Sequence, residues 1–335
     1  MHLIGRVGVS LGTAVLLGFS KGTLMEVPKT AHFLLGAKCV NDCAFCSQAR
    51  SSRSLPNQLS RVVWPDYSWR QLEGPLEAAL RDGVFRRVCA QTVDSPQGMQ
   101  IALDFIRRVR NMCPGVPISA CASPYSLSRV RAFFEAGATN VGLPIDAVTP
   151  GAYARVKKGS IDLAWRVLYK ASERWPGRIS THFIVGLGET EEEMVRALAR
   201  AKEKGIVAGM FSFTPVRGTE METVPPPEVS HYRRVQLAAY FLRRGGDVEA
   251  IEFRAGKICR IAVEDPVVQE EIQQGRPFMT SGCPDCNRPY YNERPGQVMM
   301  NFPRELGPAE ARESLLASGL LSDGYRLTWD GGQSR

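Results

Sequence analysis

The stretch Arg178-Ile-Ser-Thr-His-Phe-Ile-Val-Gly-Leu-Gly-Glu-Thr-Glu-Glu-Glu193 contains a transition from strand to helix. Residues 178–186 form a short apolar run that ends at a glycine, as buried strands often do. Thr190 and Glu193 have the spacing of a capping box, in which side chains satisfy the free backbone N–H groups of a new helix. This stretch therefore predicts a strand, a tight loop and a helix.

The same unit recurs from Trp69 onward, with a stretch of helical period, a glycine suited to end a helix, and a short apolar run. The strands predicted in this way cover residues 29–37, 86–92, 117–122, 140–146, 178–186, 209–216 and 248–253. Alternating strands and helices imply a parallel sheet. Six or seven repeats predict an α/β fold, a complete or partial (β/α) TIM-type barrel with its chemistry on loops after the strands. A doubly wound sheet is the alternative.

Three regions are expected. Residues 1–28 form an N-terminal β extension, because the apolar stretch Val7–Phe19 lacks a signal-peptide cleavage site and is interpreted as opening β structure. Residues 29–256 form the barrel. Residues 257–335 form a turn-rich C-terminal extension, long enough to fold over the barrel mouth, and its last residues, 323–335, are expected to be a loose tail.

Composition narrows the class of protein. Of the 335 residues, 44% are hydrophobic and 23% charged, which is typical of a globular chain, and no run reaches the ~20 apolar residues of a membrane span. Nine cysteines without a secretion signal favour reduced thiols as metal ligands and a cytoplasmic location. The net charge of +8 favours an acidic partner or an anionic cofactor, but the scattered basic residues do not favour nucleic acid.

Cys39, Cys43 and Cys46 follow the first predicted barrel strand, separated by three and then two residues. Three thiolates on one tight loop can bind three irons of a [4Fe–4S] cluster and leave the fourth iron open to an external chelate. Zinc is the competing metal, but structural zinc usually takes four ligands in paired sets, and no histidine lies near this loop.

This loop, with the aromatic Phe45 just before its third cysteine, resembles the motif of the radical S-adenosylmethionine superfamily. The resemblance implies that S-adenosylmethionine binds the open iron and that one electron cleaves it to a 5′-deoxyadenosyl radical, which abstracts hydrogen from an unactivated carbon. Phe45 would flank the adenine, or would simply pack beside the loop.

Along the barrel the chain resembles biotin synthase more narrowly. Residues 183–190 resemble the segment after that family's fifth strand, which implies that Gly186 and Glu189 contact the cofactor's nucleoside. Residues 140–146 resemble the segment that contacts the ribose, which implies that Asp146 binds its hydroxyl groups, unless Asp146 is a solvated strand end. His182 is interpreted as a core residue or as a side chain reaching into the barrel mouth.

Cys89 and Cys121 fall where biotin synthase has two ligands of its second, sulfur-donating cluster. They are possible metal ligands, or buried structural thiols. The other two ligand positions hold Ser180 and Glu252, so a [2Fe–2S] cluster and dethiobiotin are not carried over.

Cys259, Cys283 and Cys286 predict a second [4Fe–4S] cluster beyond the barrel, or a zinc knuckle. Residues 281–295 resemble the C-terminal motif of biotin-synthase-like proteins that form the two-protein type of lipoyl synthase. Cys113 has no partner pattern and is interpreted as structural.

The lipoyl synthase resemblance implies a sulfurtransferase that inserts sulfur into a protein-bound octanoyl chain, with the second cluster consumed as the sulfur donor. It implies an octanoylated lipoyl carrier protein or peptide as substrate, a paralogous radical subunit, and a ferredoxin or flavodoxin as reductant. The alternatives are a biotin-synthase-like enzyme acting on a free small molecule, by biotin synthesis or a rearrangement, and a non-catalytic electron carrier.

Overall fold

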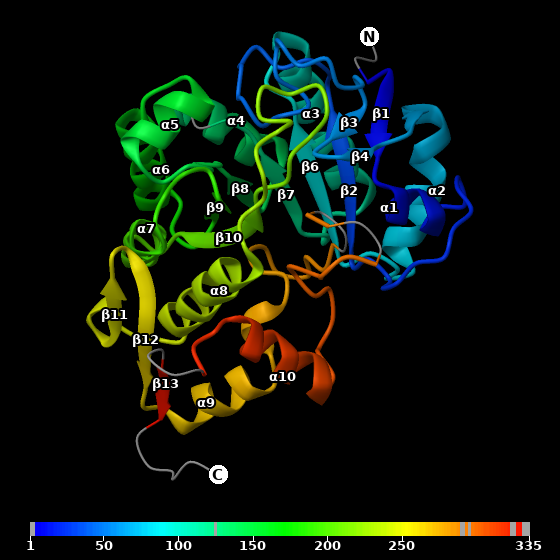
Figure 1. The fold of residues 1–335 in the computed structure, drawn as a ribbon. Coiled ribbons are helices and arrows are strands. Elements are labelled where there is room, and N and C mark those ends of the chain that lie inside the picture. The colour runs from blue at the N-terminus through cyan, green and yellow to red at the C-terminus, as the bar shows by residue number, and fades with distance from the viewer. Residues whose placement is uncertain (1–3, 124–125, 289–291, 294–295, 322–325, 330–335) are drawn as a thin grey trace.

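The computed structural model describes residues 4–123, 126–288, 292–293, 296–321 and 326–329, and its centre is an eight-stranded sheet of order β10-β9-β8-β7-β6-β2-β1-β5 (Figure 1). Six parallel strands form most of it: β2 (Thr30–Leu35), β6 (Arg87–Thr92), β7 (Ile118–Cys121), β8 (Asn140–Gly142), β9 (Ile179–Val185) and β10 (Val207–Ser212). These strands are neighbours in chain order, whereas a doubly wound sheet reverses its order part-way. The fold is therefore a partial (β/α) barrel, as predicted.

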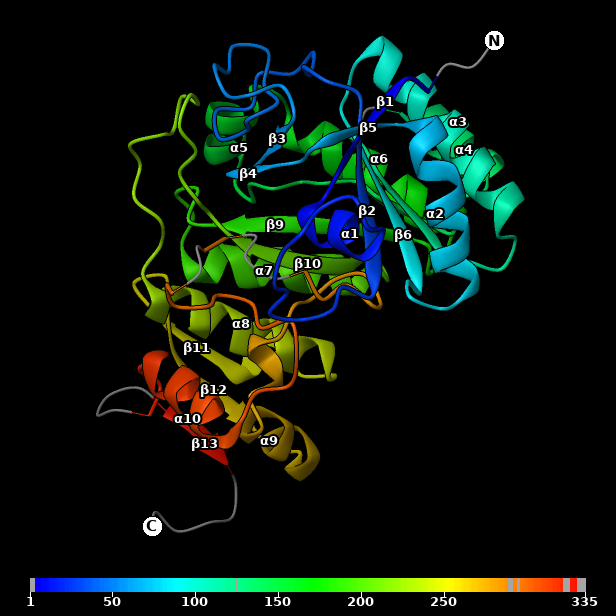
Figure 2. The ribbon, with the colours of Figure 1, turned by 90° about the vertical axis from the view of Figure 1, so that its right-hand side faces the viewer.

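Helices cover the outer side of this sheet (Figures 1 and 2). They are α2 (Trp69–Arg81), α3 (Pro96–Met112), α4 (Leu127–Ala136), α5 (Pro150–Lys157), α6 (Ile161–Arg174), α7 (Glu191–Glu203) and α8 (Val229–Arg243). Thr190 with Glu193 forms the predicted capping box, and Ser68 with Gln71 forms a second one at the start of α2. In the described part of the chain, no helix is both long and apolar enough to cross a bilayer.

The N-terminal region differs from its prediction. β1 (Arg6–Val9) pairs antiparallel with β2 and with β5 (Asp66–Ser68), but α1 (Leu11–Leu16) replaces the β structure expected through Phe19. The Thr13 hydroxyl accepts a hydrogen bond from the backbone N–H of His32 at 3.0 Å, and Ala14 is buried. Packing against β2 thus overrides the local preference. A short hairpin, β3 (Gln58–Leu59) and β4 (Val62–Val63), precedes β5.

The seventh predicted strand does not join the barrel. After the 3₁₀ turn η1 (Val248–Ala250), β11 (Ile251–Arg254) forms a hairpin with β12 (Lys257–Val263). The two residues between them, Ala255 and Gly256, both have positive φ, as the favoured two-residue hairpin turn requires. The prediction of a barrel strand here was therefore wrong, because this turn pairs the run with the strand that follows it.

The C-terminal region forms a small three-stranded sheet with α9 (Pro266–Gln273), η2 (Arg276–Phe278) and α10 (Pro308–Ala317). Its third strand, β13 (Arg326–Trp329), pairs parallel with β12. This part of the expected loose tail is therefore a strand, while residues 323–325 and 330–335 lie outside the described residues.

A buried ion pair fixes the small sheet to the barrel. Arg234 on α8 donates to both oxygens of Glu191 on α7, at 2.6 and 2.9 Å, and also to the Ser318 carbonyl at 2.8 Å. Glu191 in turn accepts the backbone N–H of Ile258 on β12 at 2.8 Å. These bonds connect α7, α8, β12 and the end of α10.

The segment 281–288 bridges the two outermost parallel strands, from the middle of β10 to the start of β2. The backbone N–H of Met210 on β10 donates to the Ser281 hydroxyl at 3.2 Å, and the Thr30 hydroxyl on β2 donates to the Asp285 carbonyl at 2.9 Å. A Cβ on Gly209 would lie only 3.3 Å from the Ser281 carbonyl, so glycine allows the close approach. Asp285 and Asn287 of this segment lie at the start of β2, the end of the barrel opposite to the mouth. Further along the extension, the Asn292 carbonyl accepts the Thr214 hydroxyl, just beyond the end of β10, at 2.9 Å, so the extension also reaches the mouth side.

Candidate functional site

Cys39, Cys43 and Cys46 lie just beyond the C-terminal end of β2 and line one cavity, which we call the loop cavity. The backbone N–H of Cys39 donates to the Gln48 carbonyl at 2.8 Å, and that of Cys46 donates to the Cys43 carbonyl at 3.0 Å. These bonds curl the loop so that its three thiols face the same space. The structure thus brings together the three ligands predicted from their spacing.

The donor set suits a [4Fe–4S] cluster with one open iron. No three His, Cys, Asp or Glu side chains among the described residues converge closely enough to hold a single metal ion. In a cubane, each thiolate binds a different iron, so such convergence is not required. Burial raises the pKa of Cys46 to about 12 and also raises that of Cys43, so metal binding at neutral pH must displace their protons.

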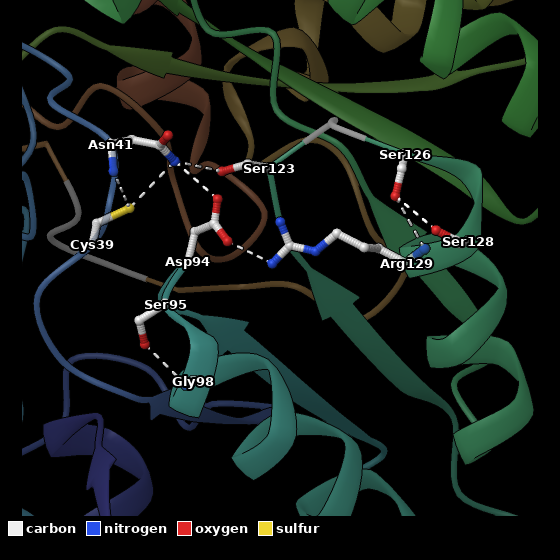
Figure 3. Close-up of polar contacts among 9 residues, drawn as sticks. All are labelled: Cys39, Asn41, Asp94, Ser95, Gly98, Ser123, Ser126, Ser128 and Arg129. Atoms are coloured by element: carbon white, nitrogen blue, oxygen red, sulfur yellow. Dashed lines mark hydrogen bonds and ion pairs between the residues drawn. The ribbon is translucent and has the colours of Figure 1, made fainter.

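A polar network supports Cys39 (Figure 3). The Asn41 side chain lies 3.4 Å from Cys39 Sγ and donates to Asp94 Oδ2 at 3.0 Å. Asp94, buried just after β6, forms an ion pair with Arg129 at the start of α4. The network ties the cysteine loop to the next two βα units. Sequence reasoning missed it, and its one signal was an aspartate directly after a strand.

Asp146, Lys157 and Phe45 line the same cavity. Asp146 has a left-handed backbone, with φ 64°, and its carboxylate forms an ion pair with Lys157 of α5. Burial opposes ionisation of Asp146, but the charge of Lys157 and the hydrogen bonds from His182 and Lys157 outweigh it and hold the pKa of this carboxyl below its usual value. The Lys157 ammonium lies 6.0 Å from the centre of the Phe45 ring. Lys157 was missed, because nothing in its spacing links it to Asp146.

Gly186 and Glu189, the other predicted cofactor contacts, are not among the residues that line the loop cavity. The Glu189 carboxylate is buried and accepts the backbone N–H groups of Gly186 at 2.7 Å and Leu187 at 2.9 Å. Gly186 has φ 100°, and a Cβ there would lie 2.8 Å from the ring of Pro227. Both residues therefore shape the turn between β9 and α7.

A second cavity, the inner cavity, lies inside the barrel. Strand residues point alternately inward and outward. Outward positions such as Val88 and Ala90 are buried in the core. The inward positions lining the cavity are mostly small or polar: Thr30, His32, Arg87, Cys89, Gln91, Ser119, Cys121, Gly142, Ser180, His182, Gly209 and Phe211. TIM barrels are ordinarily filled here by bulky branched side chains, so this barrel leaves space inside.

Four cysteines line the inner cavity: Cys89 on β6, Cys121 on β7, and Cys283 and Cys286 from the bridging segment. Burial raises the pKa of Cys89, and the nearby thiols of Cys283, Cys286 and Cys121 raise it further. Burial also raises the pKa of Cys121 to about 12. The structure therefore brings the two possible barrel ligands together with the predicted C-terminal pair.

Cys259 lies elsewhere. It is on β12 in the small sheet, where its thiol donates to the Glu252 carbonyl at 3.2 Å, and it does not line the inner cavity. Glu252 itself pairs with Arg260 at 2.5 Å in the same sheet. The structure does not bring Cys259 together with Cys283 and Cys286. Cys113 follows α3 and packs against the core, as a structural thiol would.

The two cavities share a wall. The residues lining both are Gln91, Cys121, His182, Phe211 and Asn292. His182 therefore reaches into the barrel interior, and its ring packs edge-on against Phe211 with 5.3 Å between ring centres.

Of the C-terminal motif, residues 289–291 and 294–295 lie outside the described residues.

Comparisons with known proteins agree with this geometry. The family model of the radical SAM superfamily matches residues 33–206. Lipoyl synthases of Rubrobacter xylanophilus and Stutzerimonas stutzeri are each 26% identical, over 183 and 201 residues, which are 53% and 56% of this chain and 54% and 55% of theirs. The chain thus spans about half the length of these relatives. HydG, a maturase of the [FeFe]-hydrogenase, has a similar fold, with TM-score 0.51 and 12% identity over 72% of this chain and 54% of its own.

Proposed function

Because this chain belongs to the radical S-adenosylmethionine superfamily, we propose that it inserts sulfur into a protein-bound octanoyl chain as a lipoyl synthase component. One observation carries the proposal: a cavity lined by four cysteines shares a wall with the cavity of the superfamily's cysteine loop. A carbon radical formed beside that wall needs sulfur within contact distance before it is quenched.

The loop cavity supplies the groups that the cofactor needs. When bound, the first cluster and S-adenosylmethionine supply a 5′-deoxyadenosyl radical. Cys39, Cys43 and Cys46 would hold that cluster. Asp146 would accept hydrogen bonds from the ribose, and Phe45 would pack against the adenine.

Each insertion replaces one C–H bond by one C–S bond. The hydrogen atom leaves in 5′-deoxyadenosine, and a ferredoxin or flavodoxin supplies the electron that cleaves the cofactor. The sulfur is a sulfide of the second cluster, which is consumed as a co-substrate, and the electron released when the C–S bond forms reduces one of its irons. Sulfur lost in this way is not restored without new iron and sulfide.

Two observations favour an octanoyl substrate over dethiobiotin. The curated relatives that match are named lipoyl synthase. Two ligand positions of biotin synthase hold Ser180, a hydroxyl, and Glu252, which pairs with Arg260 in the small sheet.

A third cavity provides a route for a slender alkyl chain. It adjoins the loop cavity through Ser212, Phe213 and Thr214 and is partly apolar, with Pro215, Val298 and Met300 in its lining. An octanoyl-lysine arm has the shape to reach the shared wall along this route, while its carrier stays outside.

The test is incubation with octanoylated carrier peptide, S-adenosylmethionine and dithionite, with and without a paralogous subunit. We expect 5′-deoxyadenosine together with a peptide heavier by sulfur, measured by mass spectrometry. Dethiobiotin and the free octanoate serve as competing substrates. Thiolation of a free small molecule, with no hydrogen abstraction from the octanoyl peptide, would replace this proposal by the small-molecule alternative.

A further inference from the structure

We propose that Cys89, Cys121, Cys283 and Cys286 together bind the second [4Fe–4S] cluster inside the barrel. The ligand set joins two neighbouring strands, β6 and β7, to the segment that bridges β2 and β10. It replaces the set that contained Cys259. The ligand set is inferred from the positions of the four thiols. The use of the bound cluster as a sulfur donor rests on the proposed function.

The barrel makes room for the cluster at these thiols. Cys121 pairs in register with Gly142 on β8, and Gly142 pairs with Ser180 on β9. A Cβ on Gly142 would lie 3.7 Å from Cys121 Sγ and 3.3 Å from Ser180 Oγ. Glycine and serine at these positions therefore leave the inner face open beside Cys121.

The surroundings suit an anionic cluster with four thiolates. Arg87 and Arg288 line the inner cavity. The Gln91 amide lies 2.9 Å from Cys89 Sγ, and hydrogen bonds to the sulfurs stabilise the charged cluster. His32 Nε2 lies 4.0 Å from Cys286 Sγ. These groups place positive charge and donors, rather than bulky apolar side chains, around the four thiols.

The four thiols supply one ligand for each iron of a cubane. A zinc knuckle needs four ligands that meet at one ion, and among the described residues no three such side chains converge in that way. Cys259, on β12, faces the Glu252 carbonyl in the small sheet. The geometry therefore favours a cubane inside the barrel over zinc at the C-terminal pair.

The test counts metal in a background that lacks the first cluster, Cys39→Ala/Cys43→Ala/Cys46→Ala. After anaerobic reconstitution with ferrous iron and sulfide, this background should hold about four irons per chain. Adding Cys89→Ala/Cys121→Ala should reduce the count to about one or fewer, and so should adding Cys283→Ala/Cys286→Ala, because two thiols do not hold a cubane. Adding Cys259→Ala or Cys113→Ala should leave about four.

Folding is checked separately, by placing each pair of substitutions in a chain with an intact cysteine loop. The Cys283→Ala/Cys286→Ala chain should still cleave S-adenosylmethionine, and both chains should keep the wild-type circular dichroism spectrum, which a misfolded barrel would not. The assignment is overturned if Cys89→Ala/Cys121→Ala keeps about four irons, if Cys259→Ala loses them, or if the purified protein holds zinc at this site.

The iron count and the thiolation assay fail independently. If the iron counts follow the expected pattern but octanoyl peptide is never thiolated, the ligand assignment is supported and the proposed function is contradicted. If octanoyl peptide is thiolated by a Cys89→Ala/Cys121→Ala chain that keeps both clusters, the proposed function is supported and this ligand set is contradicted.

Discussion

His182 Nε2 lies 3.0 Å from Asp146 Oδ1, and this contact sits where the two cavities meet. His182 lines both cavities, whereas Asp146 lines the loop cavity. The second carboxylate oxygen of Asp146 pairs with Lys157. One buried carboxylate therefore orients a histidine in the shared wall and neutralises a buried lysine beside the cysteine loop.

We expect Asp146→Asn to destabilise the fold, because it leaves the Lys157 ammonium buried without a counter-charge. Removing one partner of a buried pair costs about 3–5 kcal/mol, and both side chains are at most 10% exposed. The control is Glu220→Gln, which removes the partner of the neighbouring Lys158 in an exposed pair and should cost less than about 1 kcal/mol. Equal denaturant midpoints for the two variants would contradict the prediction.

The Asp146 contribution depends on pH in a defined direction. The folded-state pKa of Asp146 lies below its ordinary 3.8, so the stabilisation is complete above that pH and is lost as the pH falls toward the folded pKa. The pKa of Lys157 is raised above 10.5, because the Asp146 charge outweighs burial. Its contribution therefore persists below pH 10.5 and declines above it. Denaturant midpoints measured against pH, for wild type and Asp146→Asn, should converge only at the acidic and alkaline extremes.

The triple variant Cys39→Ala/Cys43→Ala/Cys46→Ala should form no 5′-deoxyadenosine, since these thiols would hold the cluster to which S-adenosylmethionine would bind. Chromatographic quantification after reduction with dithionite measures this directly. The Cys113→Ala chain, altered at a cysteine outside both cavities, should form 5′-deoxyadenosine at the wild-type rate. Cofactor cleavage by the triple variant would remove the assignment of these ligands.

The regular pattern of the chain was enough to predict most of the barrel. Capping boxes, terminating glycines and short apolar runs are local signals, and the six parallel strands appear within a few residues of their predicted ranges. The run at 248–253 has the same local pattern as a barrel strand. The two-residue turn at Ala255 and Gly256 pairs this run with β12 instead of with a barrel strand. Which strand a run pairs with depends on tertiary context and not on local sequence alone.

The candidate site was predictable only where its ligands are close in sequence. Cys39, Cys43 and Cys46 lie on one loop, so their spacing indicated a common site. The inner cavity joins residues separated by well over a hundred positions, such as Cys121 and Cys283. Their meeting depends on where the bridging segment crosses the barrel, which no local pattern reports.

Loss of the buried pair between α7 and α8 should loosen the C-terminal region. We expect Arg234→Ala to cost about 3–5 kcal/mol, because Glu191 would stay buried without its cation. Arg196→Ala is the control, because Arg196 forms an exposed ion pair with Glu192, the neighbour of Glu191 on α7. This change should cost less than about 1 kcal/mol. Hydrogen exchange should rise at β12 in the first variant alone, and unchanged exchange there would contradict the coupling.

A charge in the third cavity should hinder the octanoyl arm. We expect Val298→Arg to raise the KM for octanoyl peptide at least about tenfold, since an apolar chain would have to pass a charged group. Val267→Arg is the matched control, because Val267 is 55% exposed, against 58% for Val298, and lies on α9. Cofactor cleavage without peptide should be unchanged in both. Equal KM values for the two variants would exclude this route.

If the second cluster is the sulfur source, as proposed, its consumption should limit the yield. In the absence of a system that rebuilds the cluster, wild type should then insert sulfur into at most about one octanoyl peptide per chain, because each chain would hold one sacrificial cluster. Multiple turnovers with no added iron or sulfide would show that the sulfur has another source.

The double variant of the C-terminal cysteine pair separates radical formation from sulfur donation. Cys283→Ala/Cys286→Ala leaves the cysteine loop intact, and its two thiols belong to the inner cavity and not to the loop cavity. We therefore expect it to cleave S-adenosylmethionine and to abstract hydrogen from octanoyl peptide, while inserting no sulfur. Deuterium transferred from labelled octanoyl peptide into 5′-deoxyadenosine measures the abstraction, and the peptide mass measures the insertion. If this variant thiolates the peptide as well as wild type does, the sulfur does not come from the inner cavity.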